Sequence, residues 1–281
     1  MNALEIKDLR KNFPGFTLDG VSFTLPQGCI MGLVGENGAG KSTTIKLILD
    51  ILHKDGGTVR VLGKDNEKDM HLTKEDVGVV MDEVGLPECL TAKQVGKIMA
   101  NTFKNWDRAE YARLLAKLSL PENKAFKEFS RGMKMKLGIA IAMSHGAKLL
   151  ILDEPTSGLD PVVRDEVVDM FYDFTRDESH SILISSHIVS DLEKLCDYIA
   201  FLHNGRLLLC EEKDELLARY GMVHCTAEEL AVLSTAAVKH KKESPYGIEA
   251  VVLRSEIPAG LKISPISIEE LFIFMVKGEE R

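Results

Sequence analysis

The sequence predicts an α/β fold in which a mainly parallel sheet is covered by helices on both faces. Residues 29–49 read as an apolar strand, a glycine-rich loop and a helix. Residues 148–155 place four aliphatic residues before two acids and a proline, which is typical of a strand buried on both faces. The amphipathic helix pattern of 161–176 is followed by an apolar strand at 181–185. Strands and helices that alternate in this way form parallel sheets.

The first part of the chain is expected to add an antiparallel β subdomain. Residues 4–9 and 21–25 alternate between apolar and polar side chains, and a further short strand is predicted at 58–63. Phe13 lies between the first two strands. An aromatic ring at this place can either pack in the core or stack on a base.

The glycine-rich loop has the sequence of a phosphate-binding loop. It reads GENGAGKST and matches the pattern G-x-x-x-x-G-K-[ST] between a strand and a helix. Glycines let consecutive amides point into one concavity, and the helix that follows presents its positive N-terminus, so the loop can wrap a triphosphate. We expect the lysine to reach the β- and γ-phosphates and the serine hydroxyl to bind Mg²⁺. The predicted nucleotide-binding residues here are Gly35, Asn37, Gly38, Ala39, Gly40, Lys41, Ser42 and Thr43.

A helical subdomain is predicted within the sheet-based core, at about residues 84–145. A buried strand at 77–81 ends at the acidic pair Asp82-Glu83. Thr91 and Asp107 can then cap two helices, and a third helix is expected to open near Ser130.

Two acids end the apolar strand of residues 149–152. Nucleotide hydrolysis needs a second acidic ligand for Mg²⁺ and a group that activates water. Asp153 is the expected metal ligand, and Glu154 is placed to orient or deprotonate the attacking water. A P-loop NTPase core with metal ligands Ser42 and Asp153 is therefore predicted.

The pattern weakens after about residue 220. Residues 223–233 and 247–253 read as short strands around polar, charged turns such as 239–244, and 267–276 reads as a terminal helix. We therefore predict a core domain over residues 1–220 and a small C-terminal α+β appendage over 221–281. No catalytic motif is visible in the appendage.

Composition narrows the class of protein. The chain has 281 residues and a formal net charge of −8, from 35 basic and 43 acidic residues, so nucleic acid is not expected as a partner. No apolar run approaches the roughly 18 to 20 residues of a spanning helix, and the N-terminus lacks the pattern of a secretory signal. The five cysteines are scattered without a C-x-x-C pair. We expect a cytoplasmic protein that does not itself cross a membrane.

Two further motifs follow the acids, Ser157-Gly158-Leu159-Asp160 and Ser185-Ser186-His187. With the phosphate loop and Leu149 to Pro155, and in this order, they closely resemble the motifs of the ATP-binding subunits of ABC transporters, over about residues 1–220. The resemblance implies that His187 contacts the γ-phosphate and that Phe13 stacks on adenine. With it, the predicted catalytic residues are Lys41, Glu154 and His187, and the cofactors are ATP and Mg²⁺.

The chain departs from the family pattern at two places. The signature Leu-Ser-Gly-Gly-Gln is here Phe129-Ser130-Arg131-Gly132-Met133, and the resemblance implies that Ser130, Gly132 and Met133 bind the nucleotide of a partner subunit. Asp82 stands where the family usually has a glutamine. A carboxylate can bind Mg²⁺, so Asp82 is a third candidate metal ligand, although it can only accept hydrogen bonds.

The resemblance implies an ATP-hydrolysing subunit that powers export through a separate membrane permease. The subunit would work as a homodimer or heterodimer at the inner face of the cell membrane. The permease contact is expected between Asp82 and Leu120. The alternative is a soluble regulatory or assembly ATPase of the same kind with no permease. A binding-only module is disfavoured because Lys41, Asp153, Glu154 and His187 are all present.

Overall fold

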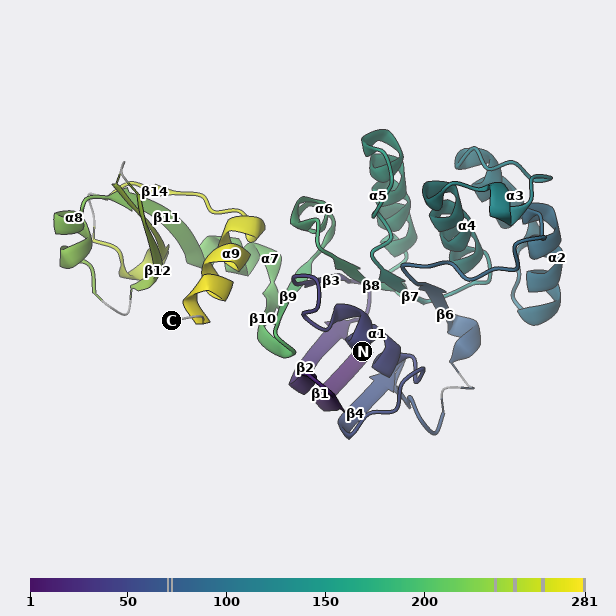
Figure 1. Ribbon diagram of the computed structural model, residues 1–281, viewed down its shortest axis with the longest axis horizontal. Helices are drawn as coiled ribbons and strands as arrows, with labels where there is room; N and C mark the ends of the chain where they lie inside the picture. Colours follow the sequence, from purple (N-terminus) through teal and green to yellow (C-terminus); the bar gives the residue numbers. More distant parts are fainter. Residues whose placement is uncertain (70, 72, 235–236, 245–246, 259–260, 280–281) are drawn as a thin grey trace.

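The computed structural model describes the chain except for residues 70, 72, 235–236, 245–246, 259–260 and 280–281. A central sheet carries helices on both sides, with an antiparallel sheet beside it and a third sheet at the far end of the molecule (Figure 1). The predicted α/β fold with an antiparallel subdomain, a helical insertion and an α+β appendage is confirmed.

The central sheet has the strand order β10-β9-β3-β8-β7-β6. All neighbours are parallel except β9 and β10, which form an antiparallel pair. Every residue of β3, β7 and β8 is buried, as the apolar runs predicted, so the carboxyl ends of these strands meet at one edge. The strands are β3 (Ile30–Val34), β6 (Val77–Val80), β7 (Leu149–Asp153), β8 (Ser181–Ser186), β9 (Tyr198–His203) and β10 (Arg206–Glu212).

Three helices begin close to that edge. They are α1 (Lys41–Ile48), α5 (Pro161–Thr175) and α6 (Val189–Leu195). Gly40 precedes α1 with φ 109°, a conformation that only glycine adopts readily. The Asp160 carboxylate caps α5 by accepting a hydrogen bond from the Val163 amide at 3.1 Å.

The antiparallel subdomain has the order β2-β1-β4-β5 and packs over α1. Its strands are β1 (Asn2–Phe13), β2 (Phe16–Pro26), β4 (Gly56–Val61) and β5 (Lys64–Asp65). The tight connection between β1 and β2 places Phe13 opposite Phe16, which brings the two aromatic rings to a centroid distance of 6.4 Å.

The helical insertion packs directly against the edge strand β6. Thr91 and Asp107 cap α2 and α3 as predicted, Thr91 in a capping box with Gln94. Helix α4 lies so close to β6 that a Cβ on Gly78 would fall 2.5 Å from the Ala142 carbonyl oxygen. The insertion comprises α2 (Ala92–Thr102), α3 (Arg108–Lys117), the short 3₁₀ turn η3 (Phe126–Glu128) and α4 (Arg131–Met143), while another 3₁₀ turn, η2 (Lys74–Asp76), precedes β6.

The C-terminal part forms a third sheet with the order β12-β13-β11-β14. Two local predictions were wrong here. Residues 227–232 are helical because Thr226 and Glu229 form a capping box, and 239–244 form a strand because they pair with β13. The terminal helix is confirmed. The elements are α7 (Lys213–Arg219), β11 (Tyr220–Cys225), α8 (Ala227–Val232), β12 (Val238–Ser244), β13 (Gly247–Leu253), η4 (Arg254–Glu256), β14 (Ile263–Ser264) and α9 (Ile268–Glu279).

Helix α9 joins the appended sheet to the core. The rings of Phe272 and Phe201 meet edge to face with centroids 5.1 Å apart, and the Ile268 amide donates to the Glu193 carboxylate at 3.1 Å. One cluster of buried apolar side chains therefore continues from the central sheet into α9, while a smaller cluster lies within the appended sheet. The domain boundary after residue 220 stays a prediction.

Candidate nucleotide site

A cavity of about 720 Å³ opens at the carboxyl edge of the central sheet, where the phosphate loop and the two acids lie. It brings together segments from across the core, including the β1–β2 connection and the start of α4. Its lining residues are Phe16, Glu36, Asn37, Gly38, Gly40, Lys41, Ser42, Thr43, Asp82, Arg131, Glu154, Ser157 and His187.

The phosphate loop folds around the side chain of Lys41. The Lys41 ammonium donates hydrogen bonds to the carbonyls of Gly35 at 2.7 Å and Glu36 at 3.2 Å. Gly35 is tightly enclosed, since a Cβ there would lie 2.5 Å from the Leu202 carbonyl oxygen. Ala39 closes the turn by donating its amide to the Glu36 carbonyl at 3.1 Å. The predicted residues Gly35 and Ala39 thus shape the loop, while the others line the cavity.

Glu154 contacts both of the other predicted catalytic side chains, Lys41 and His187. The Glu154 carboxylate stands 3.4 Å from the Lys41 ammonium, and both side chains are nearly buried, with 12% and 6% of their surface exposed. The other Glu154 oxygen accepts from His187 Nδ1 at 2.7 Å and from the His187 amide at 3.2 Å. Because a carboxylate only accepts, this contact places the His187 proton on Nδ1.

Asp153 lies behind Glu154, at the end of β7. Its carboxylate is buried and accepts a 2.6 Å hydrogen bond from the Ser185 hydroxyl on the neighbouring strand β8. The next residue, Glu154, has a φ of 53°, which is uncommon outside glycine and turns its side chain toward the loop. The register that pairs Asp153 with Ser185 fixes both acids at this edge.

The residues present fit a nucleotide with Mg²⁺. Hard divalent cations prefer oxygen ligands, and Ser42 and Asp153 supply a hydroxyl and a carboxylate at adjoining elements. The glycine loop and buried Lys41 supply amide donors and a positive charge for phosphate. The bound cation would neutralise charge on the phosphates.

One predicted residue of this chain's own nucleotide site, Phe13, lies differently from expectation. Phe13 does not line the cavity, whereas Phe16, which sequence reasoning missed, does. Ser130, Gly132 and Met133 lie outside this cavity as well, which does not conflict with their predicted role at the nucleotide of a partner subunit. The Ser130 hydroxyl caps α4 by accepting from the Met133 amide at 3.2 Å. The assignment of these residues to nucleotide binding stays a prediction.

Asp82 reaches the cavity but is already paired. Its carboxylate forms a 2.6 Å ion pair with Arg131, a residue that sequence reasoning did not select. The available signal was that Arg131 replaces a glycine of the family signature. Glu36 is a further lining residue that was missed, although it lies inside the phosphate loop.

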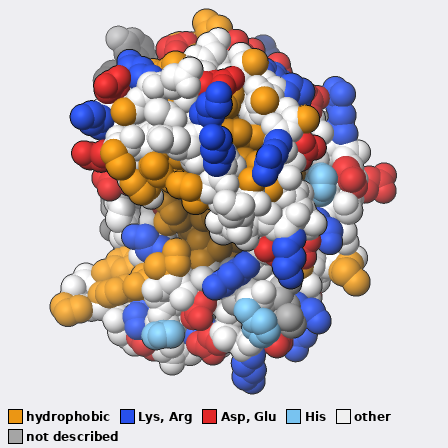
Figure 2. Space-filling view, turned by 90° about the vertical axis from the view of Figure 1, so that its right-hand side faces the viewer, with side chains coloured by type: hydrophobic (Ala, Val, Ile, Leu, Met, Phe, Trp, Pro, Cys, Tyr) orange, Lys and Arg blue, Asp and Glu red, His pale blue; other side chains and the backbone are white. Residues whose placement is uncertain are grey.

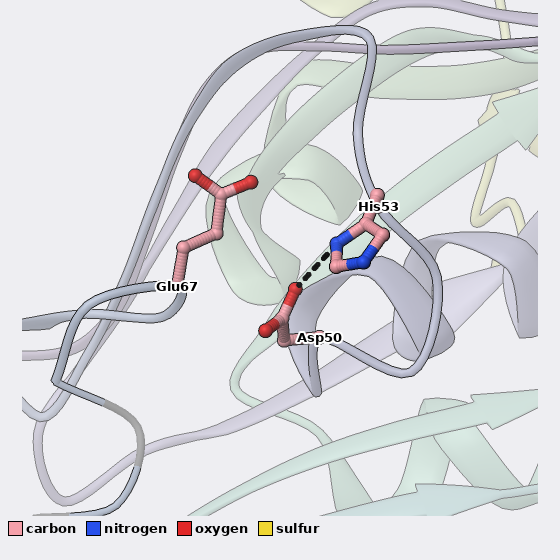
Figure 3. A group of neighbouring side chains, drawn as sticks. All are labelled: Asp50, His53 and Glu67. Atoms are coloured by element: carbon pink, nitrogen blue, oxygen red, sulfur yellow. Dashed lines mark ion pairs between the residues drawn. The ribbon is translucent and has the colours of Figure 1, made fainter.

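Among the described residues, one further group has metal-ligand chemistry, at the end of α1. Asp50, His53 and Glu67 have ligand atoms within 4.8 Å of one another (Figure 3). The His53 ring is almost fully exposed, and Glu67 already pairs with Lys54 at 2.7 Å. We therefore do not count this group as part of the nucleotide site.

Comparison with known proteins agrees with this geometry. A model of the ABC transporter family matches residues 18–157. The ABC transporter ATP-binding protein YtrB of Bacillus subtilis is 31% identical, over 99% of this chain and 99% of the relative. The lantibiotic transport ATP-binding protein SrtF of Streptococcus pyogenes is 36% identical, over 75% of this chain and 91% of the relative. The chain belongs to the ATP-binding proteins of ABC transporters.

Solved structures support the same assignment. The ATP-binding subunit of an ABC transporter superposes with a TM-score of 0.69 at 30% identity and covers 76% of this chain and 91% of its own. A dimeric ATP-binding cassette with ADP and phosphate gives a TM-score of 0.67 at 19% identity, over 75% of this chain and 98% of its own, which shows the shared fold. The protein is an ATPase that uses ATP and Mg²⁺. None of the described helices combines the length and apolar character needed to span a bilayer.

Proposed function

We propose that this ATPase powers export through a separate membrane permease. The observation that carries the hydrolytic part is the contact of Glu154 with both Lys41 and His187 in one cavity. The export part draws on relatives, which include a lantibiotic and a bacitracin transport ATP-binding protein. These names describe the relatives, and the molecule exported with this chain is left open.

The three side chains have separate tasks in hydrolysis. Glu154 accepts a proton from the attacking water, which is general-base catalysis. His187 holds the Glu154 carboxylate through its Nδ1 proton, and His187 is itself a lining residue of the cavity. Lys41 lies beside Glu154 and supplies positive charge at the phosphates.

We further propose that the site is completed by a second ATPase subunit. Ser130 and Gly132 open α4 outside the cavity of their own chain, although a helix N-terminus is suited to bind phosphate. A Cβ on Gly132 would lie 3.3 Å from the Leu159 side chain, so this helix end lies against the loop after Glu154. The phosphate bound by this helix end would belong to a nucleotide held by the partner subunit, which is either a second copy of this chain or a related chain.

We propose that residues 82–120 contact the permease, which would place this part of the protein at the inner face of the cell membrane. Figure 2 views the end of the molecule that carries the helical insertion and shows a hollow there with hydrophobic side chains gathered in it. In this region Ile98 on α2 is exposed and Val84 and Leu86 are partly buried, and Val79 on the preceding strand β6 is exposed as well. An apolar hollow of this kind suits an amphipathic segment of a partner.

Site-specific crosslinking tests the permease contact. Leu86→Cys would be made in a Cys89→Ser background, because the native Cys89 thiol is exposed nearby. We expect membranes from expressing cells to yield a crosslink from Leu86→Cys to a polytopic membrane protein. Val232→Cys, on an exposed position of α8, is the matched control and should yield none.

The same experiment separates the alternatives. A crosslink from Val232→Cys without one from Leu86→Cys would move the contact to the appendage. Loss of the protein from the membrane fraction, with ATP turnover intact, would favour the soluble regulatory ATPase.

A further inference from the structure

A buried histidine lies behind the phosphate loop and has no part in the contacts described so far. His203 is the last residue of β9, and its side chain exposes only 4% of its surface. Its Nδ1 atom is buried and has no hydrogen-bond partner within the part of the chain that the structure describes. Leaving a buried polar atom unpaired costs free energy, so such an atom needs an explanation. The carboxylate of Glu36 lies beside it, with Oε2 3.7 Å from Nδ1.

The turn after His203 supports the phosphate loop from behind. It joins β9 to β10 through Asn204 and Gly205, whose φ angles of 45° and 77° are both positive, as two-residue hairpin turns require. The Gly205 amide donates to the Ala39 carbonyl of the loop at 3.0 Å. A Cβ on Gly205 would collide with the Thr17 carbonyl oxygen, so β2 closes the other side of the turn. His203 is therefore held firmly against the loop.

The proton of the His203 ring faces Glu36. The Asn204 amide nitrogen lies 2.8 Å from Nε2. Because an amide nitrogen only donates, Nε2 is the acceptor and the ring proton lies on Nδ1. At 3.7 Å the Nδ1–Oε2 contact is longer than a hydrogen bond, but the Glu36 side chain is 58% exposed and has room to rotate toward Nδ1. His203 thus offers a buried donor to a carboxylate of the loop.

Glu36 brings an unfavourable charge to the nucleotide cavity. It lines the cavity together with the other loop residues, and its carboxylate has the same sign of charge as a triphosphate. The Lys41 ammonium donates to the carbonyl of Glu36 and pairs with the carboxylate of Glu154, so this cation is engaged elsewhere. A donor behind the loop that draws the Glu36 carboxylate back would reduce its repulsion of phosphate.

We propose that His203 is a positioning residue of the nucleotide site, whose Nδ1 proton holds the Glu36 carboxylate back from the phosphates of the nucleotide. His203 lies behind the described lining of the cavity, so it acts through Glu36 and not by touching the nucleotide. This inference rests on the proposed ATPase function and adds a residue that supports the same site. It also gives the unpaired Nδ1 atom a task.

A double-mutant cycle separates positioning from packing. His203→Leu keeps an apolar side chain in the buried place but removes the donor, so ATP affinity should fall about fivefold while kcat changes by less than about twofold. Glu36→Gln removes the charge that His203 restrains and should bind ATP at least as tightly as the native chain. In the double variant of His203→Leu with Glu36→Gln the loss should disappear, because no carboxylate is left to restrain.

Two further measurements test the electrostatic cause. His203→Asn retains an amide donor near the place of Nδ1, so it should bind ATP nearly as the native chain does. Raising the ionic strength screens exposed charges, so the loss in His203→Leu should shrink at high salt.

His145→Leu is the matched control. His145 is similarly buried, at 2% exposure, and its Nδ1 donates to the Glu75 carbonyl at 3.1 Å. Glu75 precedes β6 at the amino end of that strand, which is the edge of the sheet opposite the nucleotide cavity. His145→Leu removes a buried donor in the same way, but the ATP affinity of the folded protein should stay unchanged.

Calorimetric titration would measure ATP affinity, steady-state assays kcat and KM, and circular dichroism the folding of each variant. Native ATP affinity in His203→Leu would overturn the inference. A loss that persists in the double variant, or that high salt leaves unchanged, would assign His203 to packing alone. His203→Gln, whose amide lies nearer the place of Nε2, replaces His203→Leu in the cycle if that variant does not fold. Failure of the native chain itself to bind ATP would instead refute the proposed function, with Lys41→Ala as the non-binding reference.

Discussion

Two of the cavities lined by the described residues differ in how their charged groups are held. The nucleotide cavity measures about 720 Å³, and the other, which we call the appendage cavity, measures about 840 Å³ and lies between the appended sheet and α9. The nucleotide cavity contains nearly buried charges, Lys41 and Glu154. In the appendage cavity the charged pairs are open to solvent, as in His224 with Glu249 and Lys241 with Glu243.

The difference shows that burial of charge, and not volume, marks the reactive site. Removing a charge from water costs several kcal/mol, and the pairing of Lys41 with Glu154 and their hydrogen bonds offset part of that cost. Exposed pairs such as His224–Glu249 cost little and contribute little. The larger cavity is therefore the weaker candidate for catalysis, and three substitutions sharpen or break this comparison.

The largest effect is expected from Glu154→Gln. The amide keeps the shape of the side chain but removes the base, so ATP turnover should fall by about two to four orders of magnitude while ATP binding survives. Steady-state hydrolysis assays would measure turnover. Sizing chromatography with ATP and Mg²⁺ should then show a stable dimer, because cleavage no longer separates the subunits.

Lys41→Ala is the control for that dimer and should remain monomeric under the same conditions. Native turnover in Glu154→Gln would mean that another group activates water. A Glu154→Gln protein that binds ATP yet stays monomeric would indicate that the partner is a different ATPase chain or that the permease is required.

The second largest effect is expected on stability, from a substitution where α9 packs against the core. Phe272→Ala removes a buried ring from its contact with Phe201 and should lower the free energy of unfolding by about 3 kcal/mol or more. Denaturant unfolding would measure it. ATP affinity of the folded protein should stay unchanged, because the nucleotide cavity shares no lining residue with α9. A large loss of ATP affinity would show that the appendage is coupled to the nucleotide cavity.

The smallest effect on stability and on ATP turnover is expected from a substitution in the lining of the appendage cavity. Lys242→Glu reverses an exposed charge of its lining and should change the free energy of unfolding by less than about 0.5 kcal/mol. ATP turnover should also stay within about twofold of the native rate. A tenfold loss of turnover in this variant would break the comparison, because it would give the exposed charges a role in catalysis.

The parts predicted best from sequence depend on short-range order. The phosphate loop needs only its own glycines between a strand and a helix, and Thr91 and Asp107 cap helices that begin at the next residue. The two wrong predictions in the appendage have different causes. The capping box of Thr226 with Glu229 was readable in the sequence but was missed. The charged segment 239–244 becomes a strand only because β13 pairs with it.

The sequence by itself determined the class of fold, the phosphate loop and the acids at a strand end, because local periodicity and parallel strands bring such residues to one edge. Only the tertiary structure decided which side chains touch. It selected Phe16 over Phe13 for the cavity lining, placed His187 on Glu154 and joined Asp82 to Arg131 across 49 positions of the chain. These contacts depend on how α4 packs against β6 and how β7 registers with β8, which no single segment encodes.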